Sequence, residues 1–149
     1  MAYIEDVDFE GANLSRANLL AVDFRQNRNL EKANFEGALV HDERFVKYGA
    51  YWLGDGSNLE GADLFGRELY GARFTSANLK DADLRNANLN HASFWKADLR
   101  GADFRGANLE DASFHKADCR GAIYSETTNM GGMSITAEQL NSMILVADE

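Results

Sequence analysis

One large apolar residue recurs at every fifth position over much of this chain, and this period constrains the fold more than any other feature. Fourteen five-residue units follow one another from Ser57 without a slip. The first position of a unit is Ala in twelve of the fourteen, the second is mostly Asn or Asp, and the last two are usually charged, small or Gly. The third position holds the large residue: Leu59, Leu64, Leu69, Phe74, Leu79, Leu84, Leu89, Phe94, Leu99, Phe104, Leu109, Phe114, Cys119 and Tyr124.

A period of five fits neither an α-helix nor a continuous strand, because these would repeat at about 3.6 and 2.0 residues. It indicates a short extended piece, with a small residue inward, a polar one outward and a large one inward, followed by a turn. Asn, Asp and Gly adopt turn conformations at low steric cost. Four units close a square coil of about twenty residues, and stacked coils pair their backbones about 4.8 Å apart, as in a parallel sheet.

The A(D/N)LXX pattern resembles that of the pentapeptide-repeat proteins, over about residues 2–124. The resemblance implies an all-β fold: a right-handed quadrilateral (four-sided) parallel β-helix of stacked 20-residue coils. The chain is similar to short members of the cyanobacterial type and, more distantly, to the fluoroquinolone-resistance members of the family.

The departures from the period predict the organisation of a single domain over 1–149. One extra residue is expected near 26–28, and the segment 46–58 has no repeat pattern and is predicted to be a loop interrupting the coils. Five segments follow: first coils 2–45, loop 46–58, regular coils 59–124, connector 125–135 and a C-terminal capping helix 136–147.

Counting by twenties sorts the inward residues into four columns. If the loop returns the chain to the next side of the coil, one column contains only phenylalanine. The sequence therefore predicts a continuous ladder of Phe24, Phe45, Phe74, Phe94 and Phe114.

Both ends of such a stack expose unpaired backbone, so both need capping. Thr136 and Gln139 have the spacing of a capping box, which predicts a helix over about 137–146 whose apolar face carries Leu140, Met143, Ile144 and Ala147. The sequence contains no comparable capping segment at the N-terminal end of the stack. We expect a monomer or a weak end-to-end dimer.

The residues give no sign of catalytic chemistry. His41, His91 and His115 are scattered, and none of the common nucleophile, phosphate-loop or metalloprotease motifs occurs. Cys119 occupies a Leu column and is expected to be a buried apolar residue. A single Cys excludes a disulfide scaffold and a multi-cysteine metal site. We expect no enzyme activity, no cofactor and no metal.

Some side chains break the repeat. Arg28, Glu43 and Arg67 stand where a small inward residue is usual, which indicates local relaxation around the interruption or a binding surface. Aromatic residues in the loop and at corner positions are candidates for partner contact, because aromatics are enriched in binding hot spots. The alternative is that they pack on one another. The candidates are Tyr48, Tyr51, Trp52, Phe65, Tyr70 and Trp95.

The net charge of −9 argues against direct nucleic-acid binding. The absence of a signal peptide or an apolar run of membrane-spanning length predicts a soluble, cytoplasmic protein. The acids concentrate in the two ends of the chain, and bases are interleaved among acids in the regular coils. We expect a non-catalytic structural or protein-interaction module with an unidentified protein partner. The alternative, implied by the fluoroquinolone-resistance resemblance, is a DNA mimic that modulates a type II topoisomerase (gyrase).

Overall fold

The computed structural model describes residues 2–3, 8–20, 22–23, 28–40 and 50–147. The chain divides into two compact units, Met1–Leu53 and Gly54–Glu149. The organisation of the whole chain as a single domain stays a prediction.

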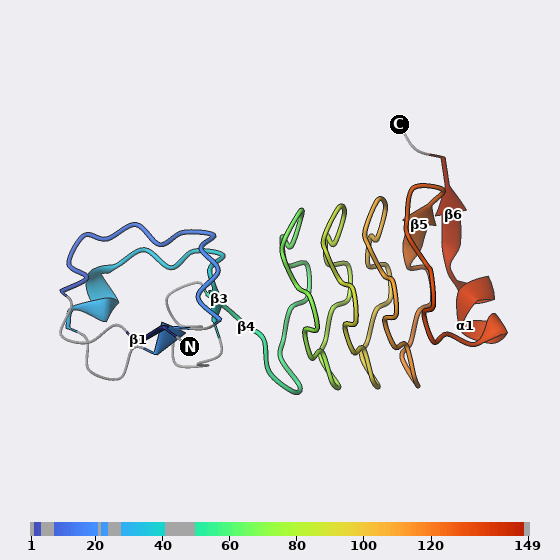
Figure 1. Ribbon diagram of the computed structural model, residues 1–149, viewed down its shortest axis with the longest axis horizontal. Coiled ribbons are helices and arrows are strands. Elements are labelled where there is room, and N and C mark those ends of the chain that lie inside the picture. The colour runs from blue at the N-terminus through green and yellow to red at the C-terminus, as the bar shows by residue number, and fades with distance from the viewer. Residues whose placement is uncertain (1, 4–7, 21, 24–27, 41–49, 148–149) are drawn as a thin grey trace. The chain divides into compact units, whose positions relative to one another are not determined.

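The second unit is a stack of coils joined by parallel bridges at every fifth residue (Figure 1). In the first coil the bridges join Asn58 to Asn78, Asp63 to Asp83, Glu68 to Asn88 and Arg73 to Ser93, each pair twenty residues apart. The residues at these four positions then bridge to the next coil in the same way. The predicted period of twenty and the parallel stacking are therefore confirmed. We call the three residues centred on each of these positions the first to fourth sides, and the two residues that follow each side its corner.

The interior of this stack contains the predicted large residues. The inward Leu, Phe and Cys residues from Leu59 to Cys119 are at most 2% exposed, and most of the intervening Ala residues are also buried. On the fourth side Phe94 stacks on Phe74 and on Phe114, with ring centroids 5.2 and 5.0 Å apart. This part of the predicted ladder is confirmed, whereas Phe24 and Phe45 lie outside the described residues.

The segment predicted as a connector continues the stack instead. Strand β5 (Ile123–Ser125) begins at the second bridging position of the fourth coil, and Asn129 and Ser134 bridge to Asn108 and Ser113 in a register of 21 residues. The additional residue in this turn explains why the period of five is not visible there. The buried Thr128 hydroxyl donates to the Phe104 carbonyl at 3.0 Å, which ties the segment to the coil before it.

The C-terminal helix begins where predicted but is shorter. Helix α1 (Ala137–Ser142) has Thr136 as its N-cap, and both hydrogen bonds of the capping box with Gln139 are present. The chain is extended at Met143 and then forms strand β6 (Ile144–Val146), which pairs with β5 in parallel. The prediction that the helix continues to about 146 is therefore wrong. Ile144, assigned to the helix face, is 50% exposed.

The first unit follows the same period with one offset. Strand β1 (Ala2–Tyr3) pairs with β2 (Val22–Asp23), and Asp8 bridges to Arg28, all twenty residues apart. The next bridge joins Asn13 to Asn34, so the extra residue enters after Arg28, where Asn29 is left-handed and precedes the 3-10 turn η1 (Leu30–Lys32). The predicted position near 26–28 was one step early.

This offset also changes the interpretation of the charged residues. Arg28 takes the outward bridging position and is exposed, not inward as the strict period suggested. Arg67 is half-buried, and its carbonyl still accepts the Asn88 N–H at 2.9 Å, so the coil keeps its pairing there. Glu43 lies outside the described residues.

Part of the predicted loop belongs to the first unit as a strand. Strand β3 (Leu39–Val40) pairs in parallel with β4 (Tyr51–Trp52), only twelve residues later. Ala50 and Leu53 on either side of β4 are each 4% exposed, and Ala50 joins the apolar core of this unit. Two residues of the predicted interrupting loop 46–58 are therefore paired with the first unit, and its residues 46–49 lie outside the described residues. The core also contains Phe9, Leu19, Phe35, Ala38 and Val40.

Candidate functional site

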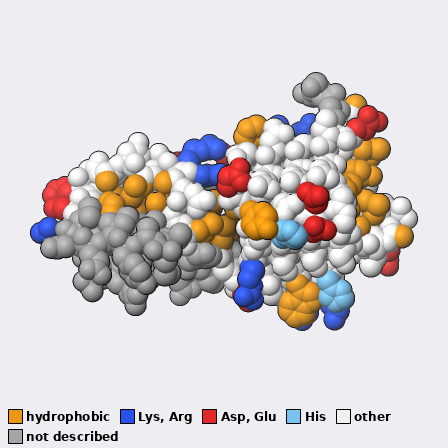
Figure 2. All heavy atoms as spheres, in the orientation of Figure 1, with side chains coloured by type: hydrophobic (Ala, Val, Ile, Leu, Met, Phe, Trp, Pro, Cys, Tyr) orange, Lys and Arg blue, Asp and Glu red, His pale blue; other side chains and the backbone are white. Residues whose placement is uncertain are grey.

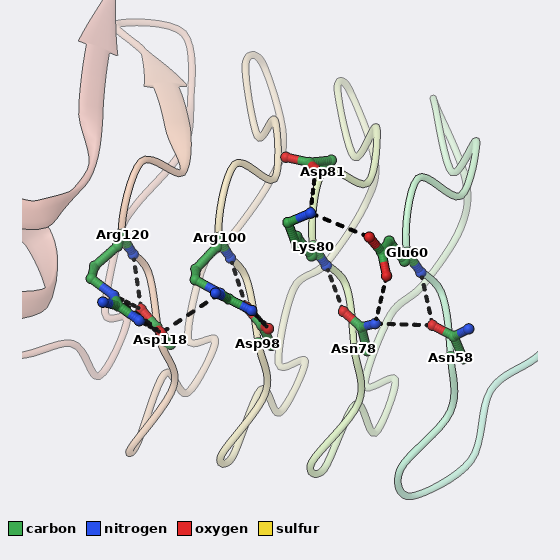
Figure 3. Close-up of polar contacts among 9 residues, drawn as sticks. All are labelled: Asn58, Glu60, Asn78, Lys80, Asp81, Asp98, Arg100, Asp118 and Arg120. Carbon is green, nitrogen blue, oxygen red and sulfur yellow. Dashed lines mark hydrogen bonds and ion pairs between the residues drawn. The ribbon is translucent and has the colours of Figure 1, made fainter.

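The outward Asn and Asp residues of the second unit hold the corners of the coils. In most units the side-chain oxygen of the bridging residue accepts the backbone N–H two residues later, as Asn78 does from Lys80 at 3.2 Å. The side chains also join successive coils: Asn78 Nδ2 donates to Asn58 Oδ1 at 3.0 Å (Figure 3). The preference for Asn and Asp at the second position of each unit is thus explained by their hydrogen bonds to nearby backbone N–H groups.

Four arginines add a second contact to this arrangement. Arg100 donates from Nε and Nη2 to the two carboxylate oxygens of Asp98 at 2.8 and 2.5 Å, and Arg120 does the same to Asp118 at 2.9 and 2.6 Å (Figure 3). The hydrogen bonds from these guanidinium groups lower the pKa of Asp98 and of Asp118. Similar two-point pairs join Arg85 to Asp83 and Arg105 to Asp103.

The remaining cation of the first corner is also neutralised. Lys80 Nζ lies 3.3 Å from Glu60 Oε1 and 3.1 Å from Asp81 Oδ2. The pKa of Glu60 is lowered by its hydrogen bond from Asn78 and, to a smaller extent, by that from Lys80. The hydrogen bonds that Lys80 donates to Asp81 and Glu60 raise the pKa of Lys80. The corner shown in Figure 3 is therefore a ladder of paired charges.

Three of the six aromatic candidates lie on the surface of the second unit. Phe65, Tyr70 and Trp95 are 45, 66 and 37% exposed. They occupy the second, third and fourth corners, so they do not form a single cluster. Tyr48 lies outside the described residues, and only the backbone of Tyr51 and Trp52 is described, in β4.

Each exposed ring has a polar neighbour from an adjacent position. The Arg85 guanidinium carbon lies 5.5 Å from the centre of the Phe65 ring, and Lys96 Nζ lies 4.3 Å from that of Trp95. Tyr70 meets the edge of His91 at a centroid distance of 5.4 Å. In the part of the chain that the structure describes, none of these three rings contacts another. The alternative interpretation, in which the loop aromatics Tyr48, Tyr51 and Trp52 pack on Phe65 and Tyr70, stays a prediction because those loop side chains are not described.

The remaining candidates for chemistry are placed as follows. His91 and His115 are exposed at the third and fourth corners, and His41 lies outside the described residues. Cys119 is buried, which raises the pKa of its thiol to about 12. No three His, Cys, Asp or Glu side chains gather as a metal site among residues 2–3, 8–20, 22–23, 28–40 and 50–147. Within the same ranges no helix has the length and apolar character to cross a membrane.

The structure separates charges that the sequence presents as interleaved. The third corner and its bridging position carry Glu68, Glu110 and Asp111, and the fourth corner carries Lys96 and Lys116. Sequence analysis missed these two lysines, although the units ASFWK and ASFHK repeat the same five-residue pattern twenty residues apart. Serine replaces the usual Asp or Asn in both units, so the bridging position supplies no carboxylate.

Comparison with known proteins identifies the repeat. A family model of pentapeptide repeats matches in eight copies, over residues 2–42, 68–106 and 96–123. No curated protein matches the sequence.

Several solved structures are also similar, including those of pentapeptide repeat proteins. A pentapeptide repeat protein from Nostoc Pcc 7120 is 25% identical with a TM-score of 0.42, covering 62% of this chain and 83% of its own. The pentapeptide repeat protein Rfr23 from the cyanobacterium Cyanothece 51142 is 19% identical with a TM-score of 0.42, covering 98 and 88%. QnrB1, a plasmid-mediated fluoroquinolone resistance protein, is 20% identical with a TM-score of 0.30, covering 93 and 84%.

Proposed function

Because the chain belongs to the pentapeptide-repeat family, whose members are generally non-catalytic, we propose that it is a binding module that presents surface side chains to a partner protein. The observation that carries the proposal is the exposure of Phe65, Tyr70 and Trp95. At the same corner positions the neighbouring coils have the polar residues Arg85, Asn90 and Thr75. Exposed aromatic side chains at polar repeat positions are typical of protein contact surfaces.

The filled interior of the coils supports a surface function. The large inward side chains from Leu59 to Cys119 are at most 2% exposed, so the functional groups of these coils are those on the outside. Catalytic and ligand sites are usually concave and partly apolar. A stack of this kind instead presents rows of side chains at a fixed spacing of about 4.8 Å.

Exchanging each aromatic for the residue of a neighbouring coil tests the proposal without altering the repeat. We expect the variant Phe65→Arg, Tyr70→Asn, Trp95→Thr to lose proteins that the wild-type chain captures from a lysate of its native cell. The control Lys80→Arg, Asn90→Glu makes the same kind of exchange at polar corners and is expected to retain them. Thermal unfolding monitors the fold of both variants. Equal capture by the wild type and the aromatic variant would contradict the proposal.

We place the binding module ahead of the DNA-mimic alternative because of the charges on the coils. Duplex DNA carries one negative charge per about 1.7 Å of axis, so a mimic needs a sustained negative face. In the described part of the second unit, arginines at the first and second corners pair with the bridging acids Asp83, Asp98, Asp103 and Asp118. Lys80 pairs with Glu60 and Asp81, and the fourth corner carries two lysines. A supercoiling assay with gyrase distinguishes the two: mimicry predicts inhibition by micromolar protein, and the binding module predicts none.

We also propose that the coils wind to the right, as the family resemblance implies. The four bridging positions per twenty residues support a four-sided coil, but pairings between residues i and i + 20 are the same for either hand. A crystal structure of the full chain tests the handedness directly, and left-handed coils would contradict it.

A further inference from the structure

Nearly every cation of the second unit has a partner in the folded chain. Lys80, Arg85, Arg100, Arg105 and Arg120 are paired with carboxylates as described above, and Arg73 Nη2 lies 3.6 Å from Asp55 Oδ2. Lys96 and Lys116 differ: within 54–147, the described part of this unit, neither ammonium group has a carboxylate partner. Both are exposed.

These two lysines occupy the same corner in successive coils. The Lys96 N–H donates to the His115 carbonyl at 3.0 Å, which places the two fourth-corner segments directly over each other. Lys96 and Lys116 both have a left-handed backbone, with φ of 59°. With Trp95 and His115 they form an exposed row that we call the lysine ridge, defined as Trp95, Lys96, His115 and Lys116.

The side chains that flank the ridge leave its positive charge uncompensated. On one flank the bridging residues are Ser93, Ser113 and Ser134, which carry no charge. On the other flank the nearest carboxylates along the chain, Asp98 and Asp118, are each engaged by two nitrogens of an arginine. In space-filling view a hydrophobic side chain, a histidine and basic side chains lie together at the lower edge of the second unit (Figure 2).

We propose that the lysine ridge binds a carboxylate-rich segment of a partner protein, with Trp95 as the apolar anchor. The proposal rests on the proposed function of the chain as a protein-binding module. The chain itself shows the complementary arrangement at another corner, where Lys80 lies between Glu60 and Asp81 at 3.3 and 3.1 Å. A partner supplying two carboxylates at this spacing gives Lys96 and Lys116 the ion pairs that the other corner cations already have.

The charge of the molecule favours a protein partner over a nucleic acid. Affinity for nucleic acid grows with the number of phosphates neutralised, and the ridge offers only two unpaired cations on a chain of net charge −9. The neighbouring third corner, with Glu110 and Asp111, repels an extended polyanion. A short acidic segment can contact the ridge without crossing that corner.

The test uses the isotope-labelled full chain and a twelve-residue glutamate peptide as the probe. We expect the peptide to shift the Trp95 indole resonance and the amides of 95–96 and 115–116. Lys96→Gln with Lys116→Gln is expected to weaken binding by about tenfold or more, since charges at a contact surface are removed. The control Arg85→Gln with Arg105→Gln removes the same charge from the second corner and is expected to bind as the wild type does. Lys96→Arg with Lys116→Arg is expected to retain binding.

Several results would overturn the proposal. Equal weakening by the two Gln variants would show a response to total charge only, and absence of any shift would show that the ridge does not bind carboxylates. Tighter, lysine-dependent binding of a twelve-nucleotide deoxythymidine strand would assign the ridge to nucleic acid. Lysine-dependent self-association in sedimentation without peptide would assign it to a second copy. If the peptide does not bind but capture of proteins from the lysate still depends on Phe65 and Tyr70, the result contradicts the ridge proposal and leaves the proposed function as a binding module intact.

Discussion

At the scale of the residue, the corners of the coils explain the composition of the repeat. Asp81, Asn86 and Asp111 adopt a left-handed backbone at corners, and in each case the side-chain oxygen leans toward the glycine of the next coil. Two separate reasons therefore require glycine at positions 101, 106 and 132: the left-handed φ, and the neighbouring side-chain oxygen that leaves no room for a Cβ. The second unit's corner glycines Gly61, Gly66, Gly71 and Gly121 meet only the first requirement.

Gly101 and Gly121 form a matched pair for this effect. Both have a φ of +70°, but a Cβ at Gly101 would overlap Asp81 Oδ1, whereas one at Gly121 meets nothing within 4 Å. Each Gly→Ala change is expected to cost about 1–2 kcal/mol for the left-handed backbone. Gly101→Ala is expected to cost about 1 kcal/mol more, because Asp81 must leave its preferred rotamer. Urea unfolding measures both, and equal losses would contradict the role of Asp81.

The arginine pairs predict how stability depends on pH. Hydrogen bonds from Arg100 and Arg120 lower the pKa of Asp98 and Asp118 in the folded chain. The unfolded chain, whose Asp pKa is about 3.9, then takes up protons first as the pH falls. The stabilisation is thus present above about pH 4 and is lost as the pH falls through the lower folded pKa values.

Removing the guanidinium groups of Arg100 and Arg120 is expected to make the unfolding free energy depend less on pH. Between pH 5 and pH 3 the wild type is expected to lose more unfolding free energy than Arg100→Gln with Arg120→Gln, because the variant has less of this stabilisation to lose. Urea unfolding at a series of pH values measures the two slopes. Parallel slopes for the two proteins would show that these pairs contribute nothing in acid.

At the scale of the element, the C-terminal cap depends on the Gln139 side chain, which makes hydrogen bonds both within the capping box and to the stack of coils. Gln139 Oε1 accepts the Thr136 N–H at 3.0 Å, and Gln139 Nε2 donates to the carbonyls of Phe114 and Ala117 at 2.7 and 2.8 Å. The amide therefore closes the capping box and also satisfies two carbonyls of the last regular coil. This second task fixes α1 to the end of the stack.

Gln139→Glu separates the two tasks. Glutamate can still accept the Thr136 N–H, but it places a carboxylate against two carbonyl oxygens and removes a donor from each, although the Phe114 carbonyl still accepts the Ala117 N–H. We expect a loss of about 2 kcal/mol at pH 7, with part of it recovered when the carboxyl is protonated in acid. Thr136→Ala, which removes only the cap, is expected to cost about 1 kcal/mol. If Gln139→Glu costs no more than Thr136→Ala, the contacts to the coil carbonyls have no energetic role.

The same element shows what could be predicted from the sequence. The start of α1 was predictable because Thr136 and Gln139 satisfy their neighbours locally. Its end was not, because Leu140, Met143, Ile144 and Ala147 have helical spacing, whereas pairing with β5 draws Ile144–Val146 into a strand. Likewise β4 depends on its pairing with β3, which no local pattern encodes. The corner aromatics were visible as departures from the repeat, but the closeness of Arg85 to Phe65 and of His91 to Tyr70 depends on the stacking of the coils.

At the scale of the whole molecule, the distribution of charge matters more than its total. The acids and bases of the regular coils nearly cancel in number, and this near-cancellation led to the interpretation of an interleaved surface. Stacking by twenties instead brings Lys96 and Lys116 together on the fourth corner, whereas Glu110 and Asp111 lie together on the third. Because every coil has the same length, a charged residue that recurs at one position of the repeat forms a row of like charges on the surface.

Stacked coils also predict that stability is local, since each coil contacts only its neighbours. Cys119 is the only cysteine and is 2% exposed in the last regular coil, where burial raises its pKa to about 12. Its reaction with a thiol reagent at pH 8 therefore requires that coil to open. Gln139→Glu, next to this coil, is expected to accelerate labelling strongly. Phe74→Leu, more than two coils away, is expected to leave the rate nearly unchanged even where urea unfolding shows a similar total loss. Equal acceleration by both variants would mean that the unit opens only as a whole.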